Sequence, residues 1–306
     1  MANDLTDPTE VAPVDAVLAS FARTPDPRLR EILTRLVRHL HAFVVDIEPT
    51  MAEWQAAIDF LTSTGHACTD RRQEFILLSD VLGVSTLVES VNDRRPDPAP
   101  AAAAAGQDRT ESTVLGPFHV VSSPPRALGD TIDLTGGGTP CLVTGEVRTT
   151  DGQPLPGATL DVWQADDQGF YDVQQPEEQP AGNGRGLFTA DADGRFRFRS
   201  VVPRHYPIPT DGPVGDLLRA TGRHANRPAH IHFIVAAEGH RSLTTQIYVA
   251  DSPYIDSDAV FAVKRRLVRE VETVHDPAAA ARHGLPSPFR QLRFDFVLEP
   301  AEEAGA

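Results

Sequence analysis

Apolar positions in the first third of the chain recur at steps of three and four residues, which places them on one face of a helix. The first helix is predicted over about residues 29–44. Its apolar face consists of Leu29, Ile32, Leu33, Leu36, Val37, Leu40, Phe43 and Val44. A second helix is predicted to begin at Thr50, because Thr50 and Glu53 have the spacing of a capping box, and to end at Gly65.

A third helical segment covers residues 71–91 (RRQEFILLSDVLGVSTLVESV), with Gly83 as a break, and helix is predicted as far as about residue 93. Residues 1–25 are polar and contain proline, which predicts a flexible arm. Residues 94–112 are rich in Pro and Ala without an amphipathic period, which predicts a linker or a strap over the surface. We therefore assign residues 26–111 to a helical domain with its linker.

Beyond residue 112 the hydrophobic period changes to two, the repeat of a β-strand. Six segments show it: CLVTGEV (141–147), TLDVWQ (159–164), GRFRFRSV (194–201), HIHFIV (230–235), LTTQIYV (243–249) and QLRFDFVL (291–298). Short strands with Gly- and Pro-rich connections are typical of a β-sandwich. One late helix is predicted in residues 258–274, with Val260, Val263, Leu267 and Val271 on one face. The fold class is α+β: an N-terminal helical region and an all-β sandwich over residues 112–306.

The formal charge is −15, from 28 Lys and Arg against 43 Asp and Glu. This balance argues against a nucleic-acid surface and does not favour anionic lipid. Cys68 and Cys141 have no CxxC spacing, so we interpret them as small apolar residues of a reducing cytoplasm. The N-terminus, MANDLTDPTEVAPVD, has no apolar core of a signal peptide, and no apolar run is long enough to span a membrane. A cytoplasmic protein is expected.

Two histidines, His230 and His232, are separated by one residue within a predicted strand. Side chains alternate along a strand, so both imidazoles leave the same face and can bind one metal ion. The pair alone is a weak signal, because it occurs in zinc enzymes, in cupin-type iron sites and by chance.

The chain has four tyrosines, and two of them, Tyr171 and Tyr206, fall in polar, loop-like segments after predicted strands. Aromatic residues in such places often pack or form lids. Phenolate is also a hard anionic ligand, but a tyrosine with a pKa near 10 ionises at neutral pH only beside a strong positive charge. Two phenolates and two imidazoles would suit Fe(III), whereas imidazole with carboxylate suits Fe(II) or zinc.

Four segments resemble the intradiol ring-cleavage dioxygenases of the catechol 1,2-dioxygenase group: STVLGPF (112–118), LPGATLDVWQADDQGFYD (155–172), HYPIPTDGPVG (205–215) and GRHANRPAHIHF (222–233). Within this group, EFILLSDVLGVS, GFYDVQ and YIDSDAVFAVK are most similar to hydroxyquinol 1,2-dioxygenases. The resemblance extends from about residue 30 to about residue 298. It implies a homodimer formed through the N-terminal helices, with a phospholipid held in a tunnel between them.

By this resemblance Tyr171, Tyr206, His230 and His232 are the ligands of one Fe(III) per chain. The implied reaction uses O2 to cleave a ring between two hydroxylated carbons. Tyr206 would leave the metal and accept a substrate proton. Arg227 would stabilise negative charge on the ring, and Gln246 would hydrogen-bond the oxygenated intermediate. Without the resemblance, Arg227 reads as a surface ion pair and Gln246 as ordinary strand polarity.

Asp80 matches the position of an acid near the bound ring in the hydroxyquinol type, where it would contact the third hydroxyl and disfavour plain catechol. Its alternative is a carboxylate on a helix surface. Further residues match the rest of the pocket wall, although each could be ordinary core: Leu77, Val114, Leu115, Gly116, Pro117, Phe118, Pro207, Ile208, Pro209 and Val260.

The leading hypothesis is therefore a ferric enzyme that converts hydroxyquinol (1,2,4-trihydroxybenzene) to 3-hydroxy-cis,cis-muconate, or maleylacetate, in aromatic catabolism. An enzyme of the same chemistry that prefers catechol or a chlorocatechol is the nearest alternative. A β-sandwich module that binds a hydrophobe would leave both tyrosines and the His pair unexplained. A cupin-like Fe(II) or zinc site would need an additional carboxylate ligand.

Overall fold

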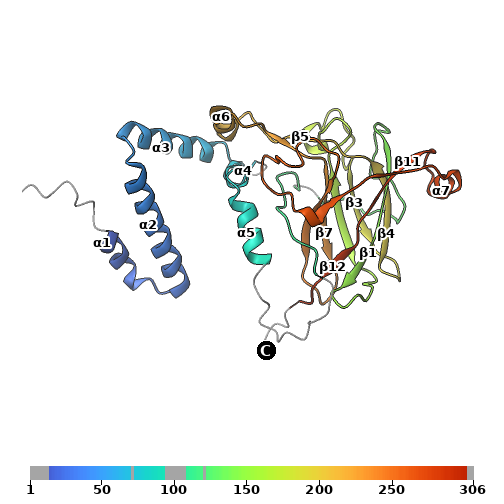
Figure 1. Cartoon of the computed structure of the whole chain (residues 1–306), viewed down its shortest axis with the longest axis horizontal. Helices are drawn as coiled ribbons and strands as arrows, with labels where there is room; N and C mark the ends of the chain where they lie inside the picture. Colours follow the sequence, from blue (N-terminus) through green and yellow to red (C-terminus); the bar gives the residue numbers. More distant parts are fainter. Residues whose placement is uncertain (1–13, 70–71, 94–107, 120–121, 302–306) are drawn as a thin grey trace, which may run out of the picture. The chain divides into compact units, whose positions relative to one another are not determined.

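The computed structural model describes residues 14–69, 72–93, 108–119 and 122–301 (Figure 1). The chain divides into two compact units, Met1–Ser63 and Thr64–Ala306, and each is described by itself. Most of the predicted linker, residues 94–107, lies outside the described residues. No described helix is both long enough and apolar enough to cross a membrane.

The first unit is helical. It consists of α1 (Val14–Ser20), the 3₁₀ turn η1 (Phe21–Arg23), α2 (Pro27–Ile47) and most of α3 (Met51–His66). Asp26 caps α2, since its carboxylate accepts the backbone N–H groups of Arg28 and Leu29. The predicted capping box of α3 is present. Glu53 accepts the backbone N–H of Thr50, and Thr50 accepts the N–H of Glu53. The prediction of a flexible arm over residues 1–25 is wrong for residues 14–23, where a short Ala- and Leu-containing helix forms.

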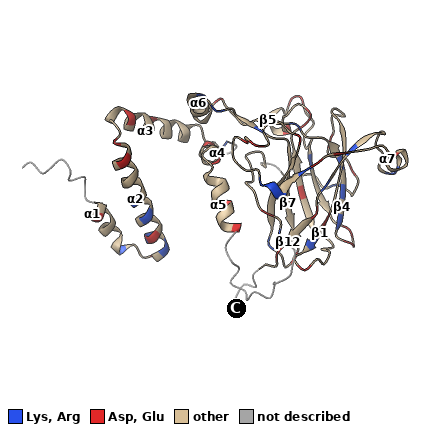
Figure 2. Cartoon of the chain, viewed as in Figure 1, with Lys and Arg blue, Asp and Glu red and all other residues tan. Residues whose placement is uncertain are grey.

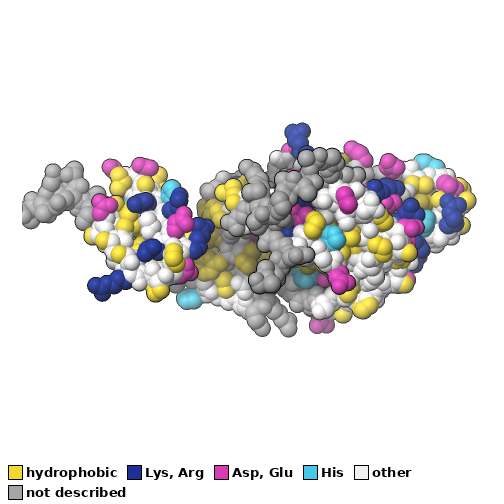
Figure 3. Space-filling model, turned by 90° about the horizontal axis from the view of Figure 1, so that it is seen from below, with side chains coloured by type: hydrophobic (Ala, Val, Ile, Leu, Met, Phe, Trp, Pro, Cys, Tyr) yellow, Lys and Arg dark blue, Asp and Glu magenta, His cyan; other side chains and the backbone are white. Residues whose placement is uncertain are grey.

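The apolar face of α2 is left uncovered by the described residues of its own unit. No residue of α2 is buried, and Leu36, Leu40 and Phe43 are 50%, 52% and 59% exposed. The same helix also carries charged residues (Figure 2), among them Arg28, Glu31 and Arg35, which form exposed ion pairs. Yellow apolar side chains are therefore visible among charged ones on this unit (Figure 3). Isolated soluble chains rarely expose so large an apolar surface.

The second unit begins with two short helices, α4 (Glu74–Val81) and α5 (Val84–Asp93), which the predicted break at Gly83 separates. Gly83 has a φ of +71°, a left-handed conformation that glycine adopts at little cost. Two further helices, α6 (Pro213–Ala220) and α7 (Pro277–His283), were not predicted.

The rest of the second unit is a β-sandwich, as predicted. One sheet has the order β10-β11-β1-β12, with β4 also paired to β1, and the other has the order β3-β2-β7-β8-β9. The strands are β1 (Pro140–Thr149), β2 (Thr159–Gln164), β3 (Arg185–Thr189), β4 (Arg195–Val201), β5 (Tyr206–Pro207), β6 (Asn226–Arg227), β7 (His230–Ala236), β8 (Leu243–Val249), β9 (Val268–Arg269), β10 (Glu272–Val274), β11 (Phe289–Arg293) and β12 (Phe296–Leu298). The short pair β5–β6 lies outside both sheets.

Aromatic side chains from both sheets meet in the core of the sandwich. Phe233 of β7 lies 6.3 Å from Phe198 of β4 and 4.9 Å from Phe296 of β12, measured between ring centroids. Its neighbours two residues away, Ile231 and Val235, are also fully buried. Because side chains alternate along β7, His230 and His232 must leave the opposite, outer face of this sheet.

The predicted late helix in residues 258–274 does not form. This region contains an irregular loop, a 3₁₀ turn at Arg265–Leu267, and the short strands β9 and β10. The carboxylate of Asp258 accepts the backbone N–H groups of Val260 and Ala262, and Phe261 has a φ of +58°. The left-handed φ of Phe261 is incompatible with a helix that continues from Asp258, so the apolar spacing here comes from separate segments.

Candidate metal centre

The register of β2, β7 and β8 sets up one polar row on the outer face of their sheet. His232 pairs with Trp163 of β2 on one side and with Gln246 of β8 on the other, and His230 pairs with Tyr248. All five side chains are at least 98% buried. The strand pairing alone therefore fixes both imidazoles and the amide of Gln246 beside one another.

Two tyrosines complete a ring of donor atoms with these histidines. Tyr171 stands just before the 3₁₀ turn η2 (Asp172–Gln174), and Tyr206 belongs to β5. Around the ring, Tyr171 Oη lies 3.3 Å from Tyr206 Oη, and Tyr206 Oη lies 3.4 Å from His230 Nε2. His230 Nε2 lies 3.0 Å from His232 Nε2, which lies 3.1 Å from Tyr171 Oη. The two tyrosines and the histidine pair, which are 24 to 61 positions apart, thus meet at one point.

These separations fit four ligands of a single metal ion. Nitrogen and oxygen ligands lie about 2.0–2.2 Å from such an ion, so neighbouring ligands are roughly 2.9–3.5 Å apart. Among the described residues, no group of three or more His, Cys, Asp and Glu side chains could hold a metal. The tyrosines are therefore essential to the donor set, and no described carboxylate supports the cupin-like alternative.

The protonation states favour metal binding by the imidazoles. Burial, reinforced by Arg227, lowers the pKa of His230 well below its usual range, and burial also lowers that of His232. The Nδ1–H of His230 donates to the carbonyl of Pro228 at 2.7 Å, which leaves Nε2 as the lone pair facing the ring. His232 Nδ1 is buried without a hydrogen-bond partner.

The two phenols need a cation in order to ionise. Burial raises the pKa of Tyr171 well above its usual range, and the nearby Tyr206 raises it further. Burial also raises the pKa of Tyr206, but there Arg227 opposes the shift. A cation of high charge at the centre of the ring would reverse these shifts. The site is therefore chemically suited to a ferric ion.

Packing holds the ring from several sides. Trp163 stacks on His232, with centroids 4.6 Å apart, and Phe118 stacks on Tyr171 at 4.5 Å. A Cβ atom at Gly116 would lie 3.0 Å from His232 Cε1, and this glycine has a φ of +79°. No side chain larger than hydrogen fits at residue 116 without moving the imidazole.

A buried ion pair holds the loop of Tyr171. Arg185 is fully buried, and its Nε donates to Asp172 Oδ1 at 2.7 Å. Its Nη2 donates to the carbonyl of Phe118 at 2.9 Å. Arg185 therefore links the residue after Tyr171 to the residue that stacks on its ring.

Arg227 lies beside the donor ring and is buried rather than on the surface. It pairs directly with Tyr206 in the β5–β6 ladder, and its Nη1 lies 3.2 Å from His230 Nε2. Its Nη2 donates to Gln246 Oε1 at 2.7 Å, and Asp258 accepts from both Nε and Nη2. Burial opposes the charge on Arg227, but Asp258 and Tyr206 hold its pKa above the usual range.

Gln246 is fully engaged in this arrangement. Its Oε1 accepts from Arg227 and from the hydroxyl of Tyr248, which lies 2.6 Å away. Its Nε2 donates to the carbonyl of Val114 at 2.6 Å. Gln246 thus connects the 112–118 segment to the guanidinium.

Asp80 is not a surface carboxylate, because it is only 3% exposed, and its Oδ1 has no hydrogen-bond partner. Burial raises its pKa, while Ser85 and Arg227 oppose the shift.

The pocket-wall candidates divide into two groups. Leu77, Val114, Phe118, Ile208 and Val260 are buried, whereas Leu115, Gly116, Pro117, Pro207 and Pro209 are partly or largely exposed.

Sequence reasoning missed Trp163, Tyr248 and Asp258. The strand pairing of Trp163 and Tyr248 with the two histidines could have indicated the first two. Asp258 gave no such signal, because its partner Arg227 is 31 residues away and its own segment was predicted to be helical.

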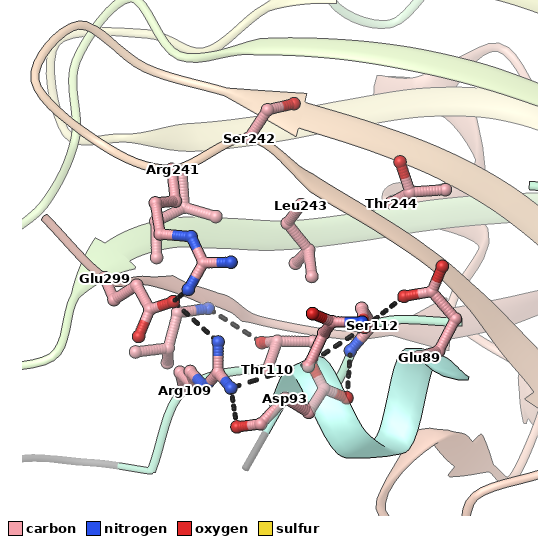
Figure 4. A pocket seen from close by; sticks show the side chains of 13 residues that line it. Glu89, Asp93, Arg109, Thr110, Ser112, Arg241, Ser242, Leu243, Thr244 and Glu299 are labelled. Carbon is pink, nitrogen blue, oxygen red and sulfur yellow. Dashed lines mark hydrogen bonds and ion pairs between the residues drawn. The ribbon is translucent and has the colours of Figure 1, made fainter. Parts of the chain in front are cut away.

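A second polar cluster lies where α5 ends and lines a pocket of about 180 Å³ (Figure 4). Asp93 accepts hydrogen bonds from Ser112 Oγ and Lys264 Nζ, both at 2.7 Å. Glu299 accepts from Arg109 at 2.6 Å and from Arg241 at 2.5 Å. Asp93 and Glu299 therefore each meet charges of the opposite sign, whereas Glu89 accepts from Ser112 Oγ at 3.0 Å.

Two family models match the chain. One, described as "Dioxygenase", matches residues 123–300, and one described as "Catechol dioxygenase N terminus" matches residues 26–99. The two matches cover the sandwich and the helices that precede it.

Individual relatives match over nearly their whole length. A hydroxyquinol 1,2-dioxygenase of Rhizobium sp. (strain MTP-10005) is 50% identical over 285 residues, 93% of each chain. A 6-chlorohydroxyquinol 1,2-dioxygenase of Cupriavidus pinatubonensis is 46% identical and covers 93% of this chain and 95% of its own. The crystal structure of hydroxyquinol 1,2-dioxygenase from Pseudomonas putida DLL-E4 superposes with a TM-score of 0.84 at 46% identity, over 94% and 97% of the two chains.

Proposed function

The chain belongs to the intradiol ring-cleavage dioxygenase family, and we propose that it opens hydroxyquinol between two hydroxylated carbons with O2. The expected product is 3-hydroxy-cis,cis-muconate, or its tautomer maleylacetate. One structural observation carries the proposal: the buried ring of four donor atoms from Tyr171, Tyr206, His230 and His232, with Arg227 beside it.

These four side chains would hold one ferric ion. When bound, the ion would lower the pKa values of the diol hydroxyls and make the aromatic ring of the substrate reactive towards O2. Neutral imidazoles and phenols that ionise only beside a cation are what such a site requires. The stacking of Trp163 on His232 and of Phe118 on Tyr171 keeps these donors in place and excludes water from two sides of the donor ring.

Tyr206 would accept one substrate proton. Arg227 stabilises the phenolate form of Tyr206, which makes this phenol easier to ionise than Tyr171. A base within hydrogen-bond reach of a bound hydroxyl is the geometric requirement for this role.

Arg227 would stabilise negative charge on the aromatic ring of the substrate. Its Nη1 faces the four donor atoms, while its other nitrogens are held by Asp258 and Gln246. Gln246 first orients this guanidinium. One N–H of its amide bonds the carbonyl of Val114, and the second N–H of the same NH2 group would be the donor to the oxygenated substrate.

Asp80 would select the substrate. A buried carboxylate oxygen without a partner is costly, and the third hydroxyl of hydroxyquinol could donate a hydrogen bond to it. Catechol has no such hydroxyl, so the carboxylate would stay unpaired.

Oxygen uptake with hydroxyquinol, catechol and 4-chlorocatechol tests this assignment, with the ultraviolet spectrum identifying each product. We expect the wild type to prefer hydroxyquinol, and Asp80→Asn to reduce the ratio of kcat/KM for hydroxyquinol to that for catechol about 10-fold or more. An unchanged ratio would rule out the role of Asp80. A wild type that prefers catechol would instead assign the chain to the catechol type.

The exposed apolar face of α2 supports a homodimer through the N-terminal helices, with a phospholipid between them. Light scattering should give twice the mass of one chain, and Leu36→Glu should shift it towards the monomer. Arg38→Glu, a charge change on the same helix, is the control. Mass spectrometry of an organic extract would test for the lipid, and a monomeric, lipid-free wild type would contradict this part.

A further inference from the structure

We propose that Asp258 is a positioning residue for ring cleavage: it fixes the guanidinium of Arg227 so that Nη1 faces the donor ring. The inference rests on the role proposed above for Arg227, and it concerns a residue that no sequence pattern indicated.

The contact between the two residues uses both oxygens of the carboxylate. Arg227 Nε donates to Asp258 Oδ1 at 3.1 Å, and Nη2 donates to Oδ2 at 3.2 Å. Both side chains are only 2% exposed. A two-point contact fixes the plane of a guanidinium as well as its position. Since Nε and Nη2 are occupied, Nη1 is the corner left to face His230.

The same carboxylate organises its own loop. It accepts the N–H of Val260 at 3.3 Å and of Ala262 at 3.1 Å, and between them Phe261 has a left-handed φ of +58°. Val260, a candidate for the pocket wall, is 2% exposed. This turn therefore holds two residues close to each other: Val260, the candidate for the pocket wall, and Asp258, whose carboxylate binds Arg227.

A second arginine ties this turn to the helix of Asp80. Arg223 Nη1 donates to the carbonyl of Val81 at 2.7 Å, and its Nη2 donates to that of Ala259 at 2.9 Å. Within the described residues, Asp258 supplies the one carboxylate hydrogen-bonded to Arg227. Asp80 and Asp258 thus lie on two segments that the side chain of Arg223 links by hydrogen bonds.

Asp258→Asn removes the charge and one of the two acceptors. In iron-loaded enzyme we expect kcat per bound iron to fall about 10- to 100-fold, the range for lost partners of groups at metal sites, with a much smaller change in KM. The visible absorption band should match the wild type, because none of the four donors is altered. Asp256→Asn is the matched control. It removes the same charge from the same loop, but Asp256 is exposed, and we expect wild-type kcat.

The double variant separates positioning from a general structural effect. If Asp258 acts through Arg227, then Arg227→Met/Asp258→Asn will have the same kcat as Arg227→Met alone. A further 10-fold loss in the double variant, or a displaced absorption band in Asp258→Asn, would overturn the proposal.

If Asp258→Asn does not fold, because it leaves Arg227 buried without its anion, Asp258→Glu takes its place. Glutamate keeps the charge but displaces the carboxylate, so a folded protein with kcat reduced about 10-fold is expected. Wild-type kcat in a folded Asp258→Glu would contradict the proposal. Full activity in Arg227→Met would instead contradict the proposed role of Arg227, whatever Asp258 does.

Discussion

Two polar clusters in the second unit differ in what their groups do for one another. In the cluster at the end of α5, most charges meet an opposite charge: Asp93 meets Lys264, and Glu299 meets Arg109 and Arg241 (Figure 4). In the donor ring, four groups that are neutral on their own converge within 3.0–3.4 Å.

We interpret the first as a structural cluster and the second as the proposed metal site. Paired charges need nothing further, so the α5 cluster connects α5, residues 109–112 and the end of β12 and offers little to a ligand. Buried phenols and imidazoles with lone pairs facing one point gain most from a cation at that point. The two clusters also differ in burial, since the four donor residues are 1% exposed whereas the side chains of Arg109 and Arg241 are 25% and 50% exposed.

His232→Ala should break the donor ring with the largest effect. Removing one imidazole should leave the protein without stoichiometric iron, and the rate should fall about 1000-fold or more, because the metal supplies several kcal/mol of transition-state stabilisation. Iron analysis and oxygen uptake on the same preparation measure both. Iron content at the wild-type level would show that His232 is not a ligand.

Tyr206→Phe should retain iron through the other three residues but lose the base. We expect a weaker visible tyrosinate band and a rate about 100-fold lower, a typical contribution of general base catalysis. Tyr254→Phe, outside the donor ring, is the matched control and should keep the wild-type colour. Wild-type colour in Tyr206→Phe would argue against ligation by Tyr206.

Asp93→Ala should have the opposite profile. Removing the shared acceptor of Ser112 and Lys264 should lower the free energy of unfolding by about 1–3 kcal/mol, while kcat per iron stays at the wild-type level. Urea denaturation and oxygen uptake would measure the two quantities. Asp108→Ala, which removes an exposed ion pair with Arg266, should change neither. A loss of activity without a loss of stability in Asp93→Ala would mean that this cluster is not merely structural.

The smallest expected effect is the pH dependence of stability that Asp80 causes. The sign of this dependence distinguishes a buried carboxylate from an exposed carboxylate that caps a helix. Burial raises its pKa, so the folded protein binds this proton more tightly than the unfolded chain. This contribution to stability is complete below the unfolded pKa of about 3.9 and is lost as the pH rises through the folded pKa, by about 1.4 kcal/mol for each unit of the shift.

The stability of the wild type relative to Asp80→Asn should therefore fall between pH 4 and pH 7. Asp276, which caps α7, provides a contrast, because the backbone N–H groups of Ala279 and Ala278 lower its pKa. Its contribution is lost as the pH falls, so the wild type relative to Asp276→Asn should show the opposite slope. Urea midpoints above about pH 4 measure the slope for Asp80, and midpoints below about pH 4 measure the slope for Asp276. The same sign of slope in the two variants would contradict the assignment.

The sequence predicts those features that local chemistry determines. The capping box at Thr50 begins α3, Gly83 separates α4 from α5, and alternation sets the bounds of β2 and β8. Because β7 alternates, the shared face of His230 and His232 also follows from the sequence. The choice of Tyr171 and Tyr206 as their partners came from the family resemblance, since no local pattern links residues so far apart.

The failed helix at residues 258–274 shows where local reasoning ends. Its apolar spacing is compatible with a helix, but Asp258 forms its strongest contacts with Arg227, which is distant in the sequence. That buried ion pair overrides a small local preference for helix. Asp258, which the sequence did not indicate, therefore lies in the same segment whose secondary structure was predicted wrongly.

Gly116 has a consequence for protein engineering. Libraries that seek new substrates commonly randomise every residue around a pocket at once. Here residues 115 and 117 can be varied, but any side chain at residue 116 would press on the imidazole of His232. A library that fixes this codon as glycine should give a far higher fraction of coloured, iron-loaded clones than one that leaves it open.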